Sequence, residues 1–250
     1  MAEKPAPITS LNDPRAIQIL STEHWSLLAT RSLAYNEAFT RGGMFLTFLS
    51  MSFVALALLA QGMSFGDQFL AVATVVLAFD LVIGLTTYGR ISGANVDDLR
   101  ALHGMARVRH AYTQAAPILE PYFTSPMHDD VESVLKSYGE LPESGIGQLG
   151  YALTTSGGMI GLVTAMVGGI LAGVVGLLLG ADGGATIWIG IGGAVAVFLA
   201  IVLATFGSVP KHQARLTAMF PAATTAVGPA TSRAAESHVS RPLPTEDDEA

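Results

Sequence analysis

The residue most suited to chemistry in this 250-residue chain is Asp80, the one acidic residue well inside a long apolar segment. An ionisable side chain within a membrane span is a functional hypothesis by default, because its burial is costly. Reflecting the surrounding hairpin about its turn places Asp80 level with Leu49 and Ser50, so the hydroxyls of Ser50 and Thr47 are expected to reach its carboxyl. Three roles are open for this carboxyl: it stabilises the packing of two helices, it relays a proton or cation, or it faces water. No basic residue lies within any apolar segment to neutralise it.

Histidines in the central part of the chain could in principle hold a metal ion. His103 and His110 are spaced to share a helix face, and His128, Asp129 and Asp130 follow them. Imidazole and carboxylate groups are metal ligands, but ordinary packing or surface histidines give the same pattern. No metal and no cofactor is therefore predicted.

Patterns that would indicate an enzyme are weak or absent. The residues from Gly145 to Gly150 read GxGxxG, but no strand precedes them and an apolar segment follows, so dinucleotide binding is not expected. The chain has no phosphate-binding loop ending in GK[ST], no HExxH and no GxSxG. Because no acid–base pair or activated nucleophile is recognisable, we expect no enzyme.

The composition places the chain among membrane proteins. Half of the residues are hydrophobic and only 13% are charged, whereas soluble domains carry about 25% charged residues. The net charge of −7 argues against nucleic acid as a partner. The chain has no cysteine, so disulfides and thiolate metal sites are excluded.

Four apolar segments, each near the 20 residues that cross a bilayer, predict an all-α protein with two transmembrane hairpins. These spans are Gly43–Ala60, Gln68–Thr87, Gly157–Gly180 and Ala185–Gly207. The bilayer is thus the first predicted partner.

The basic residues predict the orientation of the hairpins. All 13 Lys and Arg lie in the N-terminal part, the central segment or the tail, and the two hairpin turns carry only Asp67 and Asp182. The positive-inside rule then places both termini and the central segment in the cytoplasm.

Between and beyond the spans, the chain is expected to be helical near the membrane and disordered at its ends. The expected parts are a disordered N-terminus (1–12), a cytosolic amphipathic helix (13–42), hairpin one (43–87), a cytosolic helical loop (88–156), hairpin two (157–207), a juxtamembrane helix (208–220) and a disordered acidic tail (221–250). Asp13 and Pro14 are predicted to start the first helix as its N-cap and first residue.

Two apolar stripes are expected to join the cytosolic helices. Trp25, Leu28, Tyr35 and Phe39 lie on one face of the first helix. The second stripe, with Asp97 and Asp98 assigned to other faces, lies in a helix that Pro117 should stop after Ala116. Its members are Ile91, Leu99, Leu102, Met105 and Ala106. A shorter helix is expected over Ser125–Tyr138.

Small residues recur at every fourth position of the third span, which permits close helix packing in lipid. The main row comprises Gly157, Gly161, Ala165, Gly169 and Gly173, and a second row comprises Gly168, Ala172, Gly176 and Gly180. The rows are interpreted as intramolecular packing, with a homo-oligomer interface as the alternative, since the hairpin partner needs only one of them.

Several segments resemble a group of uncharacterised multi-pass membrane proteins of bacteria, notably actinobacteria. The resemblance rests on Ser32–Ser50, Met105–Tyr112 (MARVRHAY), Ile118–Phe123 (ILEPYF) and Ser125–Asp130 (SPMHDD), and spans roughly residues 20–210. It implies a bacterial cytoplasmic (inner) membrane and no assigned substrate, and it transfers no catalytic or binding residue.

These observations favour a structural or regulatory membrane protein whose cytosolic part binds an unknown cytosolic protein. The alternative is an oligomeric channel or small transporter with Asp80 near its pore. The positions expected to matter in the cytosolic part are Arg107, Arg109, His110, Tyr112, Glu120 and Tyr122.

Overall fold

The computed structural model describes residues 8–138, 153–213 and 217–222, and these contain helices and no strand. Four of the helices are long and apolar enough to cross a membrane, as the sequence predicts. The predicted Gly145–Gly150 motif, residues 1–7 of the predicted N-terminal tail and residues 223–250 of the acidic tail lie outside the described residues.

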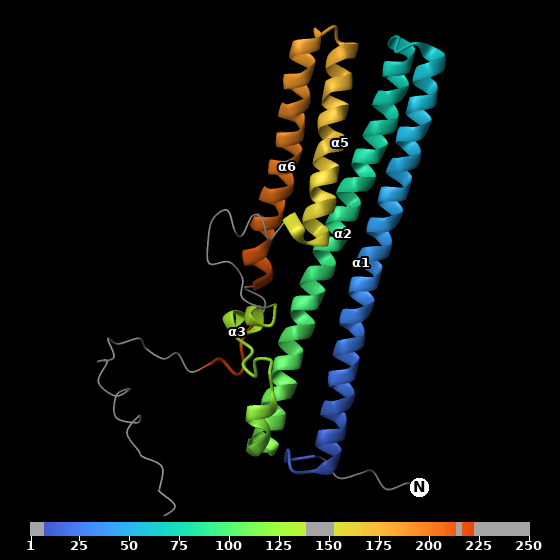
Figure 1. Ribbon diagram of the computed structural model, residues 1–250. Helices are drawn as coiled ribbons and strands as arrows, with labels where there is room; N and C mark the ends of the chain where they lie inside the picture. The colour runs from blue at the N-terminus through green and yellow to red at the C-terminus, as the bar shows by residue number, and fades with distance from the viewer. Residues whose placement is uncertain (1–7, 139–152, 214–216, 223–250) are drawn as a thin grey trace, which may run out of the picture.

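The two longest helices, α1 and α2, lie side by side along the length of the molecule (Figure 1). Helix α1 runs over Pro14–Met63 and α2 over Asp67–Ala115, so each carries one candidate span and the helical extension next to it without interruption. Asp13 caps α1 by accepting a hydrogen bond from the Arg15 backbone N–H, with Pro14 in the first turn, as predicted. Helix α2 ends at Ala115, just before Pro117, again as predicted.

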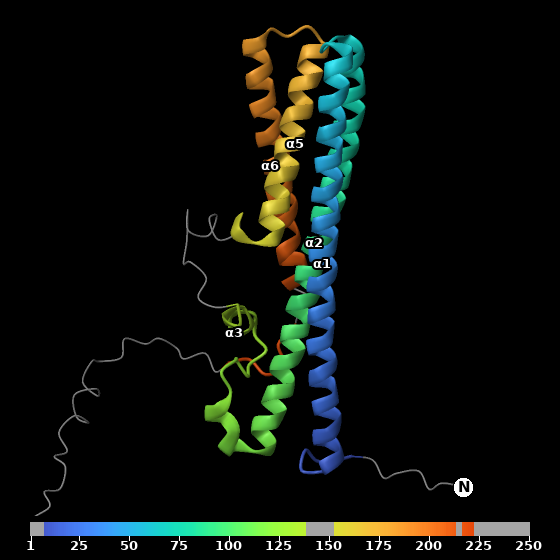
Figure 2. The same cartoon turned by 45° about the vertical axis from the view of Figure 1, so that its right-hand side comes forward.

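The second hairpin is shorter and packs beside one half of the first. Helix α5 covers Ser156–Leu178 and α6 covers Gly183–Gln213. Figure 1 and Figure 2 show both hairpin turns at the same end, while α1 and α2 extend well past α5 at the other. We call these extensions, residues 14–42 of α1 and 88–115 of α2, the stalk. Helix α2 packs between α1 and α5, and α6 packs mainly on α5.

Buried residues recur every seven positions along both long helices, which is the repeat of a left-handed coiled coil. On α1 they are Ala38, Phe45 and Ser52, with Gly42, Leu49 and Leu56; on α2 they are Leu77, Gly84, Ile91, Asp98 and Met105, with Asp80, Thr87, Ala94, Ala101 and Val108. The same repeat runs from the apolar spans into the stalk.

The structure corrects two expected elements. The helix predicted over Ser125–Tyr138 is only Val131–Lys136 (α3), because Asp130 caps it there, and a 3-10 helix (η1, Pro117–Tyr122) precedes it. Helix α6 runs on to Gln213, so the expected juxtamembrane helix over 208–220 is in part a continuation of that span. Residues 217–222 are not helical.

Candidate functional site

Asp98 is the centre of a buried polar cluster that joins the two helices of the stalk to the segment after α3. Its carboxylate is 1% exposed and accepts hydrogen bonds from Arg31 Nε (2.5 Å), Tyr35 Oη (3.0 Å) and Tyr138 Oη (2.6 Å). Arg31 and Tyr35 belong to α1, Asp98 belongs to α2, and Tyr138 follows α3. We call these four residues the Asp98 cluster. The prediction that Asp98 lies on another face than the buried stripe of its helix was wrong.

The charges in the Asp98 cluster favour a fixed protonation state. Burial and the adjacent carboxylate raise the pKa of both Tyr35 and Tyr138, so their hydroxyls remain donors. Burial alone would lower the pKa of Arg31, but its hydrogen bond and ion pair with Asp98 outweigh that effect and raise it. Donors and acceptors are thus matched, which a buried charge requires.

Asp129 is the centre of a second buried cluster, at the side of α2. It is fully buried and accepts hydrogen bonds from Arg107 Nε (2.7 Å) and from the backbone N–H groups of Met219 (2.8 Å) and Phe220 (2.7 Å). The Asp129 N–H returns a bond to the Phe220 carbonyl, and Arg107 Nη2 donates to the Thr217 carbonyl (2.7 Å). The segment after α6 is therefore held on the stalk by main-chain contacts; we call residues 217–222 the strap.

The strap is fastened at a second point by Asp130. Its carboxylate accepts from the Ala222 N–H (3.0 Å) while also capping α3 through the Ser133 N–H (3.0 Å). Burial opposes ionisation of Asp129 and Asp130, yet these hydrogen bonds lower the pKa of both, that of Asp130 to about 2. Both carboxylates are charged at neutral pH, when the strap is bound.

The histidines whose spacing suggested metal ligands lie around the strap. His103 is buried and its Nε2 accepts a hydrogen bond from Arg107 Nη2 (3.0 Å), because a guanidinium can only donate. His110 stacks on Phe220 of the strap, with ring centroids 4.2 Å apart, and its ring lies 6.1 Å from that of His128. Among the described residues no group of three or more His or acidic side chains could hold a metal.

The other positions that the sequence singled out between the second and third spans have separate environments. Arg109 is turned inward, donates to the Pro126 carbonyl (3.4 Å), and has its pKa lowered by burial and by the charge of Arg31. Tyr112 lies near the end of α2, whereas Glu120 and Tyr122 lie on η1 with Tyr122 largely exposed. The structure does not bring these three residues into the two clusters.

Asp80 is fully buried in the seam of the first hairpin, but its partner is Ser52, not Ser50 or Thr47. The Ser52 hydroxyl donates to Asp80 Oδ1 (3.0 Å), and Asp80 Oδ2 has no hydrogen-bond partner among the described residues. Ser50 and Thr47 face outward and donate to carbonyls of their own helix. The predicted level was correct to two residues, but the helix face was wrong, because two residues turn a helix by about 200°.

The main small-residue row of α5 faces other helices of the same chain, and all five of its members are buried. A Cβ on Gly169 would lie 2.7 Å from Ala194 Cβ on α6, and one on Gly161 would lie 3.2 Å from the Tyr88 ring on α2. Gly168 of the second row would likewise meet Val197, at 2.6 Å. The main row and Gly168 therefore serve packing within the chain, whereas a Cβ on Gly180 would meet nothing within 4 Å. The homo-oligomer interface stays a prediction.

The predicted aromatic stripe of α1 is not the face that packs on α2. Trp25 is 66% exposed and Phe39 is 64% exposed, and only Tyr35 turns toward α2. The face that packs on α2 carries Leu27, which contacts Gly104, together with Arg31 and Ala38. Trp25, Leu28 and Phe39, which we call the α1 stripe, are left uncovered by the described residues.

Sequence reasoning missed Asp98, Arg31, Tyr138 and Ser52. A signal for two of them was present, because Ile91, Asp98 and Met105 are seven apart, as are Ala38, Phe45 and Ser52. Counting by seven would have placed Asp98 and Ser52 in the seam.

No protein-family model, no curated protein and no solved structure matches the chain. Its function is therefore inferred from this geometry.

Proposed function

We propose that the protein is a membrane-anchored docking protein whose stalk presents the α1 stripe to a cytosolic protein. The carrying observation is the exposure of Trp25, Leu28 and Phe39 on one side of a helix whose inner face is fixed by the Asp98 cluster. Exposed apolar side chains that lie together mark interaction sites, and aromatic side chains supply much of the energy at protein interfaces. The carboxylates of Asp98 and Asp129 bond to groups of the same chain, which favours recognition over catalysis.

Site-specific photocrosslinking in cells tests the docking proposal. A benzoylphenylalanine at Trp25 or Phe39 should give one adduct of defined mass, and the same residue at Thr30, on another exposed face of α1, should not. Leu28→Asp should remove the adduct at Trp25 without changing the amount of protein in the membrane. Equal adducts at Trp25 and Thr30, or adducts only with a second copy of the chain, would contradict the proposal.

The proposed location is a bacterial cytoplasmic membrane, with both termini and the stalk in the cytoplasm. The charge distribution supports this orientation, since the turns between the helix pairs lack basic residues. Because the chain has no cysteine, single-cysteine variants report accessibility without background. Leu179→Cys, in the exposed turn after α5, should react with a membrane-impermeant maleimide from outside, and Glu132→Cys, on α3, should react only after lysis.

A channel or small transporter that uses Asp80 is the second candidate. It is favoured by one observation, the unpartnered Oδ2 of a fully buried carboxyl between two candidate spans. Flux of protons or monovalent cations into liposomes that falls with Asp80→Asn but not with Asp67→Asn would support it. Absence of flux in the unaltered protein would remove it.

A further inference from the structure

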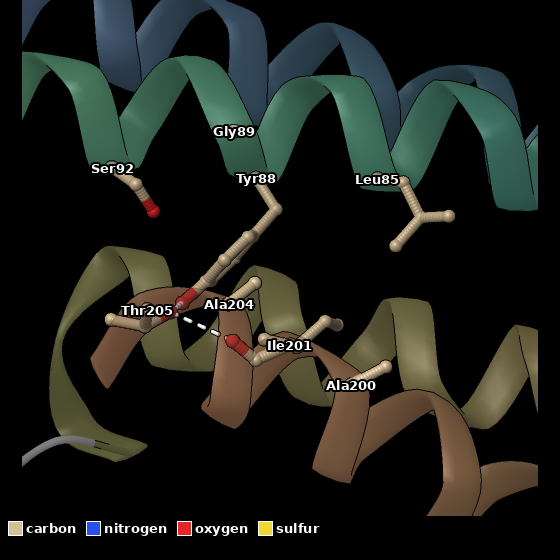
Figure 3. Close-up of a pocket in the computed structure, with 8 residues that line it drawn as sticks. All are labelled: Leu85, Tyr88, Gly89, Ser92, Ala200, Ile201, Ala204 and Thr205. Carbon is tan, nitrogen blue, oxygen red and sulfur yellow. Dashed lines mark hydrogen bonds between the residues drawn. The ribbon is translucent and has the colours of Figure 1, made fainter. Parts of the chain in front are cut away.

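A crevice lies between α2 and α6. Its volume is about 330 Å³, and it is lined by Leu85, Tyr88, Gly89 and Ser92 of α2 and by Ala200, Ile201, Ala204 and Thr205 of α6 (Figure 3). This volume is at the lower end of that found for small-ligand sites. Five of the lining residues are Gly, Ala, Ser or Thr, and their short side chains leave the space open.

The crevice is placed to open on the hydrocarbon of the bilayer and to end near its surface. Helix α6 packs mainly on α5, so its side toward α2 is left open, and both helices are candidate spans. From Leu85 to Ser92 the crevice follows α2 for about 10 Å. Arg90, between those positions, forms an ion pair with Glu37 (2.6 Å) on the α1 side of α2 and marks where charged residues begin. The Leu85 end is therefore at the depth of acyl chains and the Ser92 end at the depth of headgroups.

The polar groups of the crevice gather at the Ser92 end and have defined hydrogen-bonding roles. The Thr205 hydroxyl donates to the Ile201 carbonyl (2.8 Å), so in its 2.6 Å contact with Tyr88 the phenol is the donor. The two oxygens therefore bond to each other across the crevice (Figure 3). The Ser92 hydroxyl points toward α6 and has no hydrogen bond with the described residues, so it has a donor to offer.

We propose that this crevice binds one glycerophospholipid of the bilayer, with an acyl chain between Leu85 and Ala200 and an ester carbonyl accepting a hydrogen bond from Ser92. The apolar end suits a hydrocarbon chain, and the single unused donor suits the ester oxygen that lies where the chain meets the headgroup. No charged side chain lines the crevice, so the headgroup charge is not selected.

Photolabelling of the full chain in vesicles tests this proposal. The vesicles contain phosphatidylethanolamine and phosphatidylglycerol with a trace of a phospholipid that carries a diazirine in one acyl chain. Label should concentrate on peptides that contain Leu85–Ser92 and Ala200–Thr205. Ala204→Phe, which fills the crevice, should lower that label about tenfold, equivalent to losing two buried methylene groups. Leu203→Phe, on the exposed outer side of α6, should leave it unchanged.

A second comparison tests the ester contact with a variant that adds no bulk. An ether-linked analogue lacks the ester carbonyl and should compete less well than the ester lipid against the label. Ser92→Ala should abolish that difference without changing the labelled peptides. Label that follows surface exposure over the whole of α6 and is unaffected by Ala204→Phe would overturn the proposal. Ready disulfide dimerisation through Ala204→Cys would also overturn it, because a second copy would then fill the crevice.

Discussion

Arg31 of α1 and Asp98 of α2 are 67 positions apart in the chain and form an ion pair in the stalk, at an N–O distance of 2.5 Å. Asp98 occupies a position of the seven-residue repeat that is otherwise held by Leu77, Gly84, Ile91 and Met105. A single polar residue at such a position can fix the register of two helices at a cost in stability. In this stalk, a slide of α1 along α2 by one turn would leave both charges without their partners.

We expect Asp98→Ala to destabilise the stalk by about 3–5 kcal/mol. The substitution removes the carboxylate that accepts hydrogen bonds from Arg31 and from the two tyrosine hydroxyls, and it leaves the charge of Arg31 partly buried without its partner. Asp97→Ala, which removes a neighbouring but exposed pair with Arg100, should cost about 0–1 kcal/mol. Hydrogen exchange of α1 and α2 backbone amides in detergent micelles measures both. Equal protection in the two variants would show that the cluster does not hold the stalk together.

The strap should be released by a single substitution at Asp129. Asp129→Asn replaces a carboxylate that accepts from the Met219 and Phe220 N–H groups and from Arg107. Hydrogen bonds to a charged group contribute about 1.5–3 kcal/mol each, so amide exchange at residues 219–220 should rise at least about tenfold. Glu132→Gln on α3, whose side chain is 82% exposed, is the matched control. An unchanged exchange rate in Asp129→Asn would mean that other contacts hold the strap.

The elements could be predicted from local patterns, whereas the clusters depend on which helix faces meet. Apolar length identified four spans, and Asp13 and Pro117 marked helix boundaries. To predict that Ser52 bonds to Asp80, one must know which face each helix turns to the other as well as how far each residue lies from the hairpin turn. The turn at 64–66 determines only that distance. The strap could not be anticipated, because Asp129 binds backbone N–H groups about 90 residues away, and backbone groups carry no sequence signature.

Acid should weaken the attachment of the strap to the stalk in two stages. Burial and the charge of Arg107 lower the pKa of His103 in the folded protein below its usual 6.5. His103 therefore binds a proton more readily in the unfolded chain, and the free energy of unfolding should fall as the pH drops below about 6.5. Asp129 and Asp130 have lowered pKa values, so their contribution is present above pH 3.8 and is lost as the pH falls toward about 2.

Amide exchange of the strap against pH measures these stages. His103→Gln should remove the first stage and leave the second, whereas Asp130→Asn should reduce the second. A pH profile of His103→Gln identical to that of the unaltered chain would assign the first stage to another group.

Gly84 is required where α1, α2 and α5 meet, one turn beyond Asp80. A Cβ there would lie 2.6 Å from Thr164 Oγ1 and 3.0 Å from the end of the Phe45 ring, and both neighbours are buried. Gly84→Ala should therefore lower stability by about 1–3 kcal/mol through overpacking. Gly43→Ala, where a Cβ meets nothing within 4 Å, should instead raise stability by about 0.5–1 kcal/mol, since alanine has a higher helix propensity than glycine. Thermal unfolding in detergent micelles measures the difference. Adding Thr164→Ala to Gly84→Ala should recover part of the lost stability, because it removes the Thr164 Oγ1 atom that lies closest to the new Cβ. A double variant no more stable than Gly84→Ala would place the strain at Phe45.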